Sequence, residues 1–265
     1  MIPQNYVEQW EQHAPWQSLA MVEQDLIISR ALIELFQQEK ICTSLIFRGG
    51  TALNKLYLKP PARYSEDIDF VQRHPEPIGE TITAIRSALD HWLGEPKRKI
   101  TERGIKLIYK YTNIDQAIVK LKVEINTTEH FHVLASQTIE HHINTNWFSG
   151  VSAIHTYTLE ELMATKLRAL YQRRKGRDLF DVWFICSQNK LDTNSMLQIF
   201  QKYCAYNGVV ITKRDFTENL QLKRASKDFQ IDMSVLLPKT TAISWDFSRA
   251  LDYVQTTIID ALPDK

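Results

Sequence analysis

Hydrophobic residues in the first third of the chain alternate between helical and strand spacing. Between residues 16 and 38 they recur along one helix face without Gly or Pro, which predicts an amphipathic helix. A short apolar run at 44–47 ends at a Gly-Gly pair, which is typical of a buried strand that enters a tight turn. Residues 51–58 then predict a short helix that stops before two prolines, and 66–71 predict the next strand.

The middle of the chain adds one helix and a hairpin, and the last part is helical. Residues 78–93 have the helical period, whereas 106–111 and 118–126 alternate between apolar and polar positions as two partners of a hairpin do. A weaker strand is expected at 151–157, and helical patterns follow from 158 onward. The pattern therefore predicts an α+β part, residues 1–157, and an α-helical part, residues 158–265.

Composition places the chain among globular proteins. It has 265 residues, 44% of them hydrophobic, and 32 basic against 31 acidic residues give a net charge of +1. Any nucleic-acid contact must therefore come from local patches, because the chain is no bulk polycation. Three scattered cysteines predict no disulfide framework. The start does not resemble a secretory signal and no segment has about 18 consecutive apolar residues, so we expect a cytoplasmic protein without a membrane partner.

The segment 47–70 combines a Gly-Gly turn with two closely spaced aspartates. Gly49 and Gly50 allow a sharp turn and close approach to a ligand, and the helix that follows offers N–H groups suited to phosphates. Asp67 and Asp69 are two residues apart, so on a strand they share a face, where Mg²⁺ would relieve their repulsion. A Gly-Gly turn alone is common, and an Asp-x-Asp pair alone is typical of an exposed strand edge. The two features together favour a functional site.

The string GGTALNKLYL…RYSEDIDF resembles the nucleotidyltransferase toxins of the AbiEii/AbiGii abortive-infection family, in the DNA polymerase β-like superfamily. The resemblance implies that Asp67 and Asp69 bind Mg²⁺, or Mn²⁺ in its place. It also implies a nucleotide site formed by Gly49, Gly50, Thr51, Arg63 and Ser65. For Arg63 and Ser65, an ordinary loop arginine and a turn serine are equally consistent with the sequence.

Members of the superfamily usually place a third carboxylate on a neighbouring strand. Glu124 is the only acidic residue in the strand expected at 118–126, and it faces away from the apolar side. It is therefore the candidate for a further metal ligand or for the base that accepts the proton of the attacking hydroxyl. The alternative is a solvated strand residue beside Lys122.

A lysine on the apolar side of a helix marks the second candidate region. Thr158 and Glu161 form a capping-box pattern at the start of this helix. At 100° per residue Lys166 falls in the middle of the apolar stripe, and a buried ammonium needs an anion nearby. Reaching out to solvent is the alternative for such a side chain.

The stretch 166–177 contains six basic residues and no acidic one. We expect it to bind RNA through Arg168, Arg173, Arg174, Lys175 and Arg177, although a solvated helix end would also explain the charges. Gly176 is expected to end the first helix and Asp178 to cap the next. The string ELMATKLRALYQRRKGRDLFDVW resembles the second signature of the same family, which implies that Lys166 and Asp181, and less securely Asp178, join the active site.

The two resemblances cover about residues 20–190 and imply a complete functional hypothesis. The fold would be α+β, with a polymerase β-like nucleotidyltransferase core of mixed sheet and flanking helices and a C-terminal helical lobe. The enzyme would transfer NMP from an NTP to an RNA, with the tRNA 3′ end as the expected acceptor, and so block translation. An adjacent helix-turn-helix antitoxin, similar to AbiEi, would neutralise it. A small-molecule nucleotidyltransferase and a non-catalytic nucleotide-binding module are the alternatives.

Overall fold

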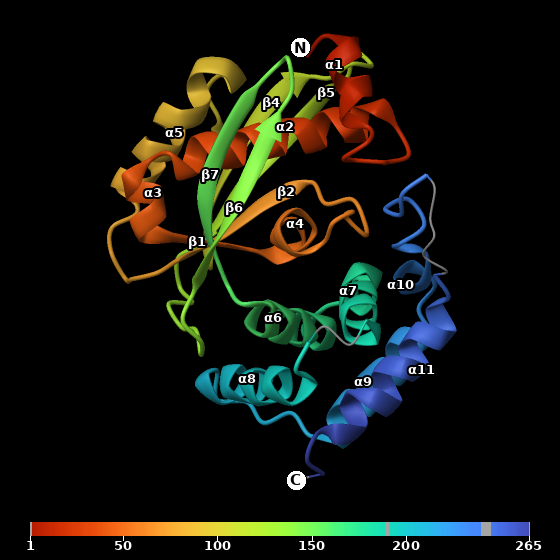
Figure 1. Ribbon diagram of the computed structural model, residues 1–265. Coiled ribbons are helices and arrows are strands. Elements are labelled where there is room, and N and C mark those ends of the chain that lie inside the picture. Colours follow the sequence, from red (N-terminus) through yellow and green to blue (C-terminus); the bar gives the residue numbers. More distant parts are fainter. Residues whose placement is uncertain (1, 189–190, 240–244, 265) are drawn as a thin grey trace. The chain divides into compact units, whose positions relative to one another are not determined.

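The computed structural model describes residues 2–188, 191–239 and 245–264 (Figure 1). Contacts between residues divide the chain into two compact units. Unit 1 comprises residues 1–131, 136–157 and 237–240, and unit 2 comprises 132–135, 158–236 and 241–265. Among the described helices, none combines the length and the apolar character that a membrane span needs.

Unit 1 is built on a mixed seven-stranded sheet. Its strands are β1 (Leu45–Arg48), β2 (Asp67–Gln72), β3 (Lys97–Thr101), β4 (Gly104–Thr112), β5 (Ile118–Asn126), β6 (Gln137–Asn144) and β7 (Ser149–Thr156). They lie in the order β3-β4-β5-β2-β1-β7-β6. The pairs β2–β5 and β1–β7 are parallel and the other four pairs are antiparallel. The centre of the sheet is therefore formed by β2 and β1, the two strands on either side of the Gly-Gly turn.

The sequence predicts five of these strands, including the antiparallel hairpin of β4 and β5, and misses two. Both missed strands, β3 and β6, are the edges of the sheet. β3 has the sequence KRKIT, four of whose residues are exposed, and β6 has the sequence QTIEHHIN with a single buried residue, Ile143. Edge strands bury little apolar surface, so their sequences lack the hydrophobic alternation that predicts a strand.

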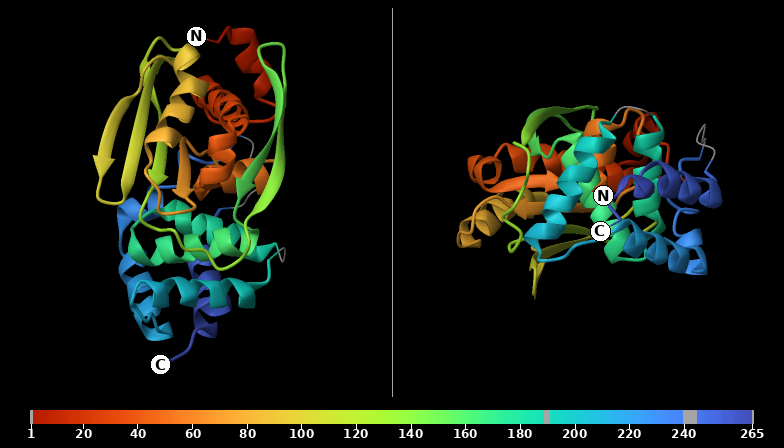
Figure 2. Two further views of the ribbon diagram at one scale, coloured as in Figure 1. Left: turned by 90° about the vertical axis from the view of Figure 1, so that its left-hand side faces the viewer. Right: turned by 90° about the horizontal axis from the view of Figure 1, so that it is seen from below.

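The helices of unit 1 are α1 (Gln4–Trp10), α2 (Leu19–Phe36), α3 (Glu39–Ser44), α4 (Gly49–Ala52) and α5 (Gly79–Leu93), and a π-helical turn (Leu53–Tyr57) continues α4. Strands β3–β5 and strands β6 and β7 lie on either side of α2 (Figure 2). The amide of Gln24 in α2 donates to Lys120 O of β5 (3.3 Å), and Ser152 Oγ of β7 donates to Ile33 O of α2 (2.8 Å). Because the sheet surrounds it, α2 is buried along most of its length.

Polar anchors hold the elements around α2 together. The buried Asp25 accepts hydrogen bonds from the indole nitrogens of Trp10 (2.7 Å) and Trp16 (3.0 Å). Lys55 of the π-helical turn completes the cluster with an ion pair to Asp25 Oδ1 (2.5 Å). A buried carboxylate with three donors is satisfied, so Asp25 fixes both the N-terminal segment and the turn after α4 to α2.

Unit 2 consists of helices. They are α6 (Leu159–Gln172), α7 (Gly176–Ser187), α8 (Thr193–Tyr206), α9 (Lys213–Arg224), α10 (Lys227–Ile231) and α11 (Phe247–Thr257), followed by a 3₁₀ turn (Ile259–Ala261). Helix α6 packs against α7 and α8, and α11 packs against α7. The apolar stripes that the sequence shows after residue 158 form this helical core, with Phe180, Phe200 and Phe216 fully buried.

Two predictions about the ends of α6 are wrong. Gly176 does not end α6 but begins α7, where a Cβ would lie 2.4 Å from Phe229 O, so close packing explains the glycine. Thr158 caps α6 as predicted, accepting from Glu161 N (3.3 Å), but the reciprocal half of the capping box is absent among the bonds described. The Glu161 carboxylate instead accepts from Leu134 N (2.7 Å) and from the Tyr203 hydroxyl (2.6 Å).

Candidate active site

The Gly-Gly turn brings the start of α4 against the second aspartate of β2. Gly49 has φ +85°, a conformation that L side chains rarely adopt. A Cβ at this position would lie 2.4 Å from Asp69 Oδ2. Glycine is therefore required at position 49 for two reasons, the positive backbone angle and the close approach of the Asp69 carboxylate.

The next two residues connect the turn to the loop before β2. A Cβ on Gly50 would lie 2.5 Å from Arg63 Nη2 and 3.0 Å from Ser65 Oγ, so both side chains pack onto this glycine. Thr51 is buried, and its hydroxyl donates to Asp67 O (2.5 Å) and lies 2.9 Å from Ser65 Oγ. The five predicted nucleotide-site residues thus form one continuous cluster with the aspartates of β2.

Asn54 is part of this cluster, although the sequence does not single it out. It is 5% exposed, and its Nδ2 donates to Gly50 O (3.0 Å). Its Oδ1 accepts from Ala62 N (3.0 Å) and Arg63 N (3.1 Å). Asn54 therefore holds the Gly50 turn and the Arg63 loop in a fixed relation. An asparagine inside a helical run carries no signal of this role, because the two backbone donors that its Oδ1 accepts from lie eight and nine residues further along the chain.

Asp67 and Asp69 lie on the same face of β2, as the two-residue spacing predicts. Asp67 Oδ1 accepts from Lys122 Nζ of β5 (3.1 Å). Burial raises the pKa of Asp67 to about 6, against the opposing effect of Lys122 and with a further increase from the charge of Asp69. Ionising Asp67 is costly in the protein alone, and a bound cation would stabilise its carboxylate form. The pair therefore suits a divalent metal ion.

Basic residues flank both aspartates. Arg48 is paired with Asp69 across β1 and β2, and its Nη1 lies 3.0 Å from Glu129 Oε2. Burial lowers the pKa of Arg48, but the nearby Tyr157, Glu129 and Asp69 outweigh it and raise the pKa overall. Burial lowers the pKa of Lys122, but the charge and hydrogen bond of Asp67 outweigh it together with the nearby acidic groups, so this pKa is raised overall. These cations keep the carboxylates in place.

The predicted third carboxylate, Glu124, lies next to Asp69 in the parallel pairing of β2 with β5. Its Oε2, however, is 2.6 Å from Lys106 Nζ of β4. Within the described part of the chain, no three His, Cys, Asp or Glu side chains are grouped closely enough to hold a metal ion. The metal roles of Asp67, Asp69 and Glu124 therefore stay predictions.

In unit 2, Lys166 and two aspartates form a buried cluster. Lys166 is 5% exposed, and its Nζ lies 2.8 Å from Asp181 Oδ2 and 3.6 Å from Asp178 Oδ1. Asp178 does not cap α7, whose N-cap is Lys175; it lies in the first turn, where its carboxylate accepts two hydrogen bonds from Arg173 (2.7 and 2.9 Å). The lysine on the apolar stripe of α6 is therefore enclosed and paired rather than extended into solvent.

The remaining basic residues of the segment 166–177 have different surroundings. The guanidinium of Arg168 lies over the Tyr203 ring, 4.7 Å from its centroid. Arg174 and Lys175 are exposed in the turn between α6 and α7, and Arg177 is half-buried. Because Lys166 and Arg173 are paired with aspartates, fewer cations of this segment are available to an anion than the sequence indicates.

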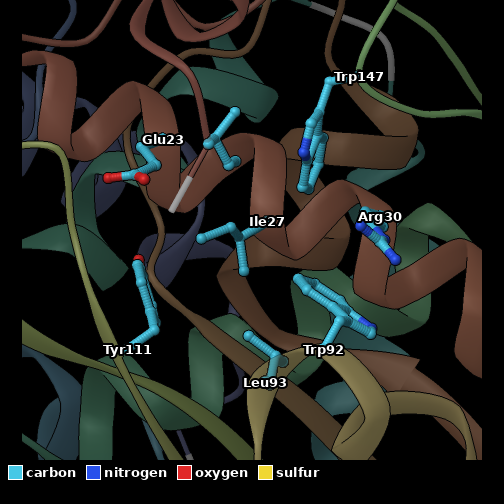
Figure 3. Close-up of a pocket in the computed structure, with 8 residues that line it drawn as sticks. Glu23, Ile27, Arg30, Trp92, Leu93, Tyr111 and Trp147 are labelled. Atoms are coloured by element: carbon cyan, nitrogen blue, oxygen red, sulfur yellow. The ribbon is translucent and has the colours of Figure 1, made fainter.

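Unit 1 also contains a cavity of about 190 Å³ beside α2 (Figure 3). Its walls include Glu23, Trp92 and Trp147, and Arg30 lies over both indole rings while pairing with Glu34 (2.8 Å). Burial raises the pKa of Glu23, whose Oε2 accepts from Ile114 N (2.7 Å). None of the described residues that line this cavity belongs to the predicted site, so the catalytic candidates lie elsewhere.

Comparison with known proteins agrees with this fold. The structure of MenT4, a nucleotidyltransferase toxin from Mycobacterium tuberculosis H37Rv, has a TM-score of 0.65 at 16% identity and covers 99% of this chain and 91% of its own. JHP933 from Helicobacter pylori has a TM-score of 0.56 at 17% identity and covers 91% of this chain and 92% of its own.

The sequence itself identifies the family. A search of curated proteins finds no significant match to it. Residues 30–253, however, match the family model described as nucleotidyl transferase AbiEii toxin, Type IV TA system. Because this match covers most of the chain, the protein belongs to the AbiEii family of nucleotidyltransferase toxins of toxin–antitoxin systems.

Proposed function

We propose that this nucleotidyltransferase transfers NMP from an NTP to RNA, with the 3′ end of tRNA as acceptor, and thereby blocks translation in the cytoplasm. The observation that supports this most directly is the packing of Gly49 against Asp69, which sets two carboxylates on one strand face beside the start of a helix. Such an arrangement suits a metal-bound triphosphate.

In this proposal the residues of unit 1 bind the donor nucleotide. Asp67 and Asp69 hold Mg²⁺, or Mn²⁺, and the bound ion supplies the positive charge that stabilises the entering and leaving oxygens. The backbone of Gly49 and Gly50 faces the β- and γ-phosphates. Thr51, Arg63 and Ser65 are buried or half-buried around this turn, so they orient the backbone that contacts the phosphates.

The proposal extends to unit 2 through the family resemblance. Lys166 stabilises negative charge on the triphosphate or on the pyrophosphate that leaves, and Asp181 orients it at 2.8 Å. Glu124 and Asp181 are the two candidates for accepting the proton of the RNA hydroxyl. The exposed cations of the turn between α6 and α7, Arg174 and Lys175, contact the RNA backbone.

The partner that neutralises the toxin is an antitoxin. The Type IV assignment of the family supports its existence, and we propose a helix-turn-helix protein similar to AbiEi. Co-expression of the adjacent gene with the toxin tests this part, and we expect growth to resume.

The central experiment incubates purified protein with each labelled NTP in turn, Mg²⁺ and total tRNA. We expect label on tRNA with one NTP. Because two carboxylates hold the ion, Asp67→Asn should lower the transfer rate at least about 1,000-fold. The matched control is Glu66→Gln, which removes an exposed carboxylate one residue away and should keep nearly the full rate.

Two results would contradict the proposal. Transfer by Asp67→Asn at the wild-type rate would exclude the metal role of the β2 aspartates. Label that stays off RNA but appears on an added aminoglycoside would instead indicate a small-molecule nucleotidyltransferase.

A further inference from the structure

One face of the sheet in unit 1 is lined with lysines that continue outward from the catalytic aspartates. Residues directly opposite each other on paired strands share a face. The register places Lys122 beside Asp67, Lys106 beside Glu124, and Lys99 beside Lys106. The lysine face consists of Lys97 and Lys99 of β3, Lys106 and Lys110 of β4, and Lys120 and Lys122 of β5.

The opposite side of the same strands forms the core. Leu107 and Tyr109 of β4 and Leu121 and Val123 of β5 are at most 1% exposed. Helix α5 covers this side, and the Tyr109 hydroxyl bonds to Asp90 of α5 (3.1 Å). The helices of unit 1 that pack on these strands therefore lie on the apolar side, and the lysines point the other way.

The lysine pattern is unfavourable for the sheet alone. Lys99 lies directly opposite Lys106, and Lys110 lies directly opposite Lys120. Like charges in directly opposed positions destabilise a strand pair, and a solvated face gains more from alternating signs. Two such pairs occur on one face of the sheet, and a bound polyanion would relieve the repulsion within both.

Most of these charges are not used within the chain. Lys122 pairs with Asp67 (3.1 Å) and Lys106 pairs with Glu124 (2.6 Å). For the other four lysines, Lys97, Lys99, Lys110 and Lys120, no ion pair occurs within the described residues, and all four are exposed. The acidic groups of this face thus lie on β2 and at Glu124 of β5, and the unpaired cations lie on β3, β4 and β5.

The geometry points to a path for the RNA acceptor: we propose that its phosphate backbone lies along the lysine face and so reaches Asp67 and Asp69. This inference rests on the proposed function. From β2 to β3 the face spans three inter-strand spacings, about 14 Å in all, which corresponds to about four phosphates of a stacked strand. Ile118, 73% exposed on β5, offers an apolar contact beside the cations for a base or ribose.

The test measures binding of labelled tRNA to the full-length protein without NTP, at several salt concentrations. The variant carries Lys97→Gln, Lys99→Gln, Lys110→Gln and Lys120→Gln together. Each phosphate contact releases counterions, so the tRNA Kd of the variant should rise at least about 30-fold. The negative slope of log affinity against log salt should become less steep by about 3. The equivalent four Lys→Arg substitutions keep the charge and should restore most of the affinity.

A matched control uses the same strand. Arg98 lies between Lys97 and Lys99, but it is paired with the buried Leu107, so it belongs to the opposite face. Arg98→Gln removes one exposed charge from β3 and should change the tRNA Kd less than twofold, whereas Lys99→Gln should raise it about threefold. Equal effects of these two substitutions would show a diffuse charge effect and would overturn the proposal.

The outcome also separates this inference from the proposed function. Wild-type protein that labels no RNA yet binds it through the lysine face would refute the proposed transfer and leave the RNA surface intact. If the wild type labels tRNA but the four-lysine variant keeps the same tRNA Kd and salt slope, the proposed role of the lysine face is refuted and the proposed transfer is not. If the four-lysine variant binds RNA as the wild type does but no longer co-purifies with an acidic protein, the proposed RNA path is overturned in favour of a protein partner.

Discussion

Two basic regions of the chain, the lysine face of unit 1 and the segment 166–177 of unit 2, use their charges differently. In the segment, Lys166 and Arg173 are held by Asp178 and Asp181, and Arg168 lies over an aromatic ring. On the lysine face, four of the six lysines have no acidic partner within the described residues. The region that is more concentrated in sequence therefore offers fewer available cations.

The difference shows that charge density along a sequence is not charge density on a surface. The basic residues of the segment 166–177 lie on α6, on the turn after it and on α7, so they point in several directions, and the buried Lys166 meets carboxylates. Lysines spread over three strands look sparse in the sequence, yet the register gathers them on one face. Interior cations thus contribute to folding and positioning, and strand cations remain available for binding.

The largest effect on stability is expected where the charges are buried. Asp178 is fully buried and pairs with both Lys166 and Arg173, so Asp178→Asn removes one of the two carboxylates at the buried ammonium together with the ion pair to Arg173. We expect a loss of about 3–5 kcal/mol in the free energy of unfolding, measured by urea denaturation. Lys97→Gln with Lys99→Gln should stay within about 0.5 kcal/mol. A loss below about 1 kcal/mol for Asp178→Asn would contradict the contrast between the regions.

A smaller effect is expected on RNA binding from the exposed end of the segment. Arg174→Gln with Lys175→Gln removes two exposed charges and should raise the tRNA Kd about three- to tenfold. The salt slope should fall by about 1.5, half of the change expected for the four lysines of the sheet. A larger rise in the tRNA Kd than the four-lysine variant shows would identify the segment as the main RNA surface and would contradict the contrast between the two regions.

The smallest effect concerns a lysine of unit 2 that is almost fully enclosed. Lys223 is 2% exposed and donates to Tyr171 O (3.0 Å), and burial lowers its pKa to about 8. Since the folded state releases this proton more readily than the unfolded state, stability should rise as the pH increases from about 8 toward 10.4. Between pH 7 and pH 9 we expect a gain of about 1 kcal/mol in the free energy of unfolding.

The control for this prediction is Lys223→Met, which removes the titrating group. Urea denaturation of this variant should show a smaller increase between pH 7 and pH 9 than the wild type. An identical increase in both proteins would assign the pH dependence to other groups.

Sequence reasoning found part of the unit 1 cluster for a definite reason. Gly49 and Gly50 require no knowledge of distant contacts, because a strand that ends in two glycines must turn. Asp67 and Asp69 share a face by strand geometry alone. Asn54 could not be found, because its partners are backbone groups of Gly50, Ala62 and Arg63 that only the folded turn brings within reach. The role of Glu161 was misjudged similarly, since its partners Leu134 and Tyr203 come from other segments.

Local chemistry, namely turn residues, strand alternation and the family motifs, is sufficient to establish the α+β class and the nucleotidyltransferase family of this chain. Those features depend on interactions between residues that are close in the sequence, so each short segment is sufficient to predict them. The edge strands, the pairing of Lys166 with two aspartates and the gathering of six lysines depend instead on strand order and helix packing. They become visible in the folded chain because burial and cross-strand register are properties of contacts between distant segments.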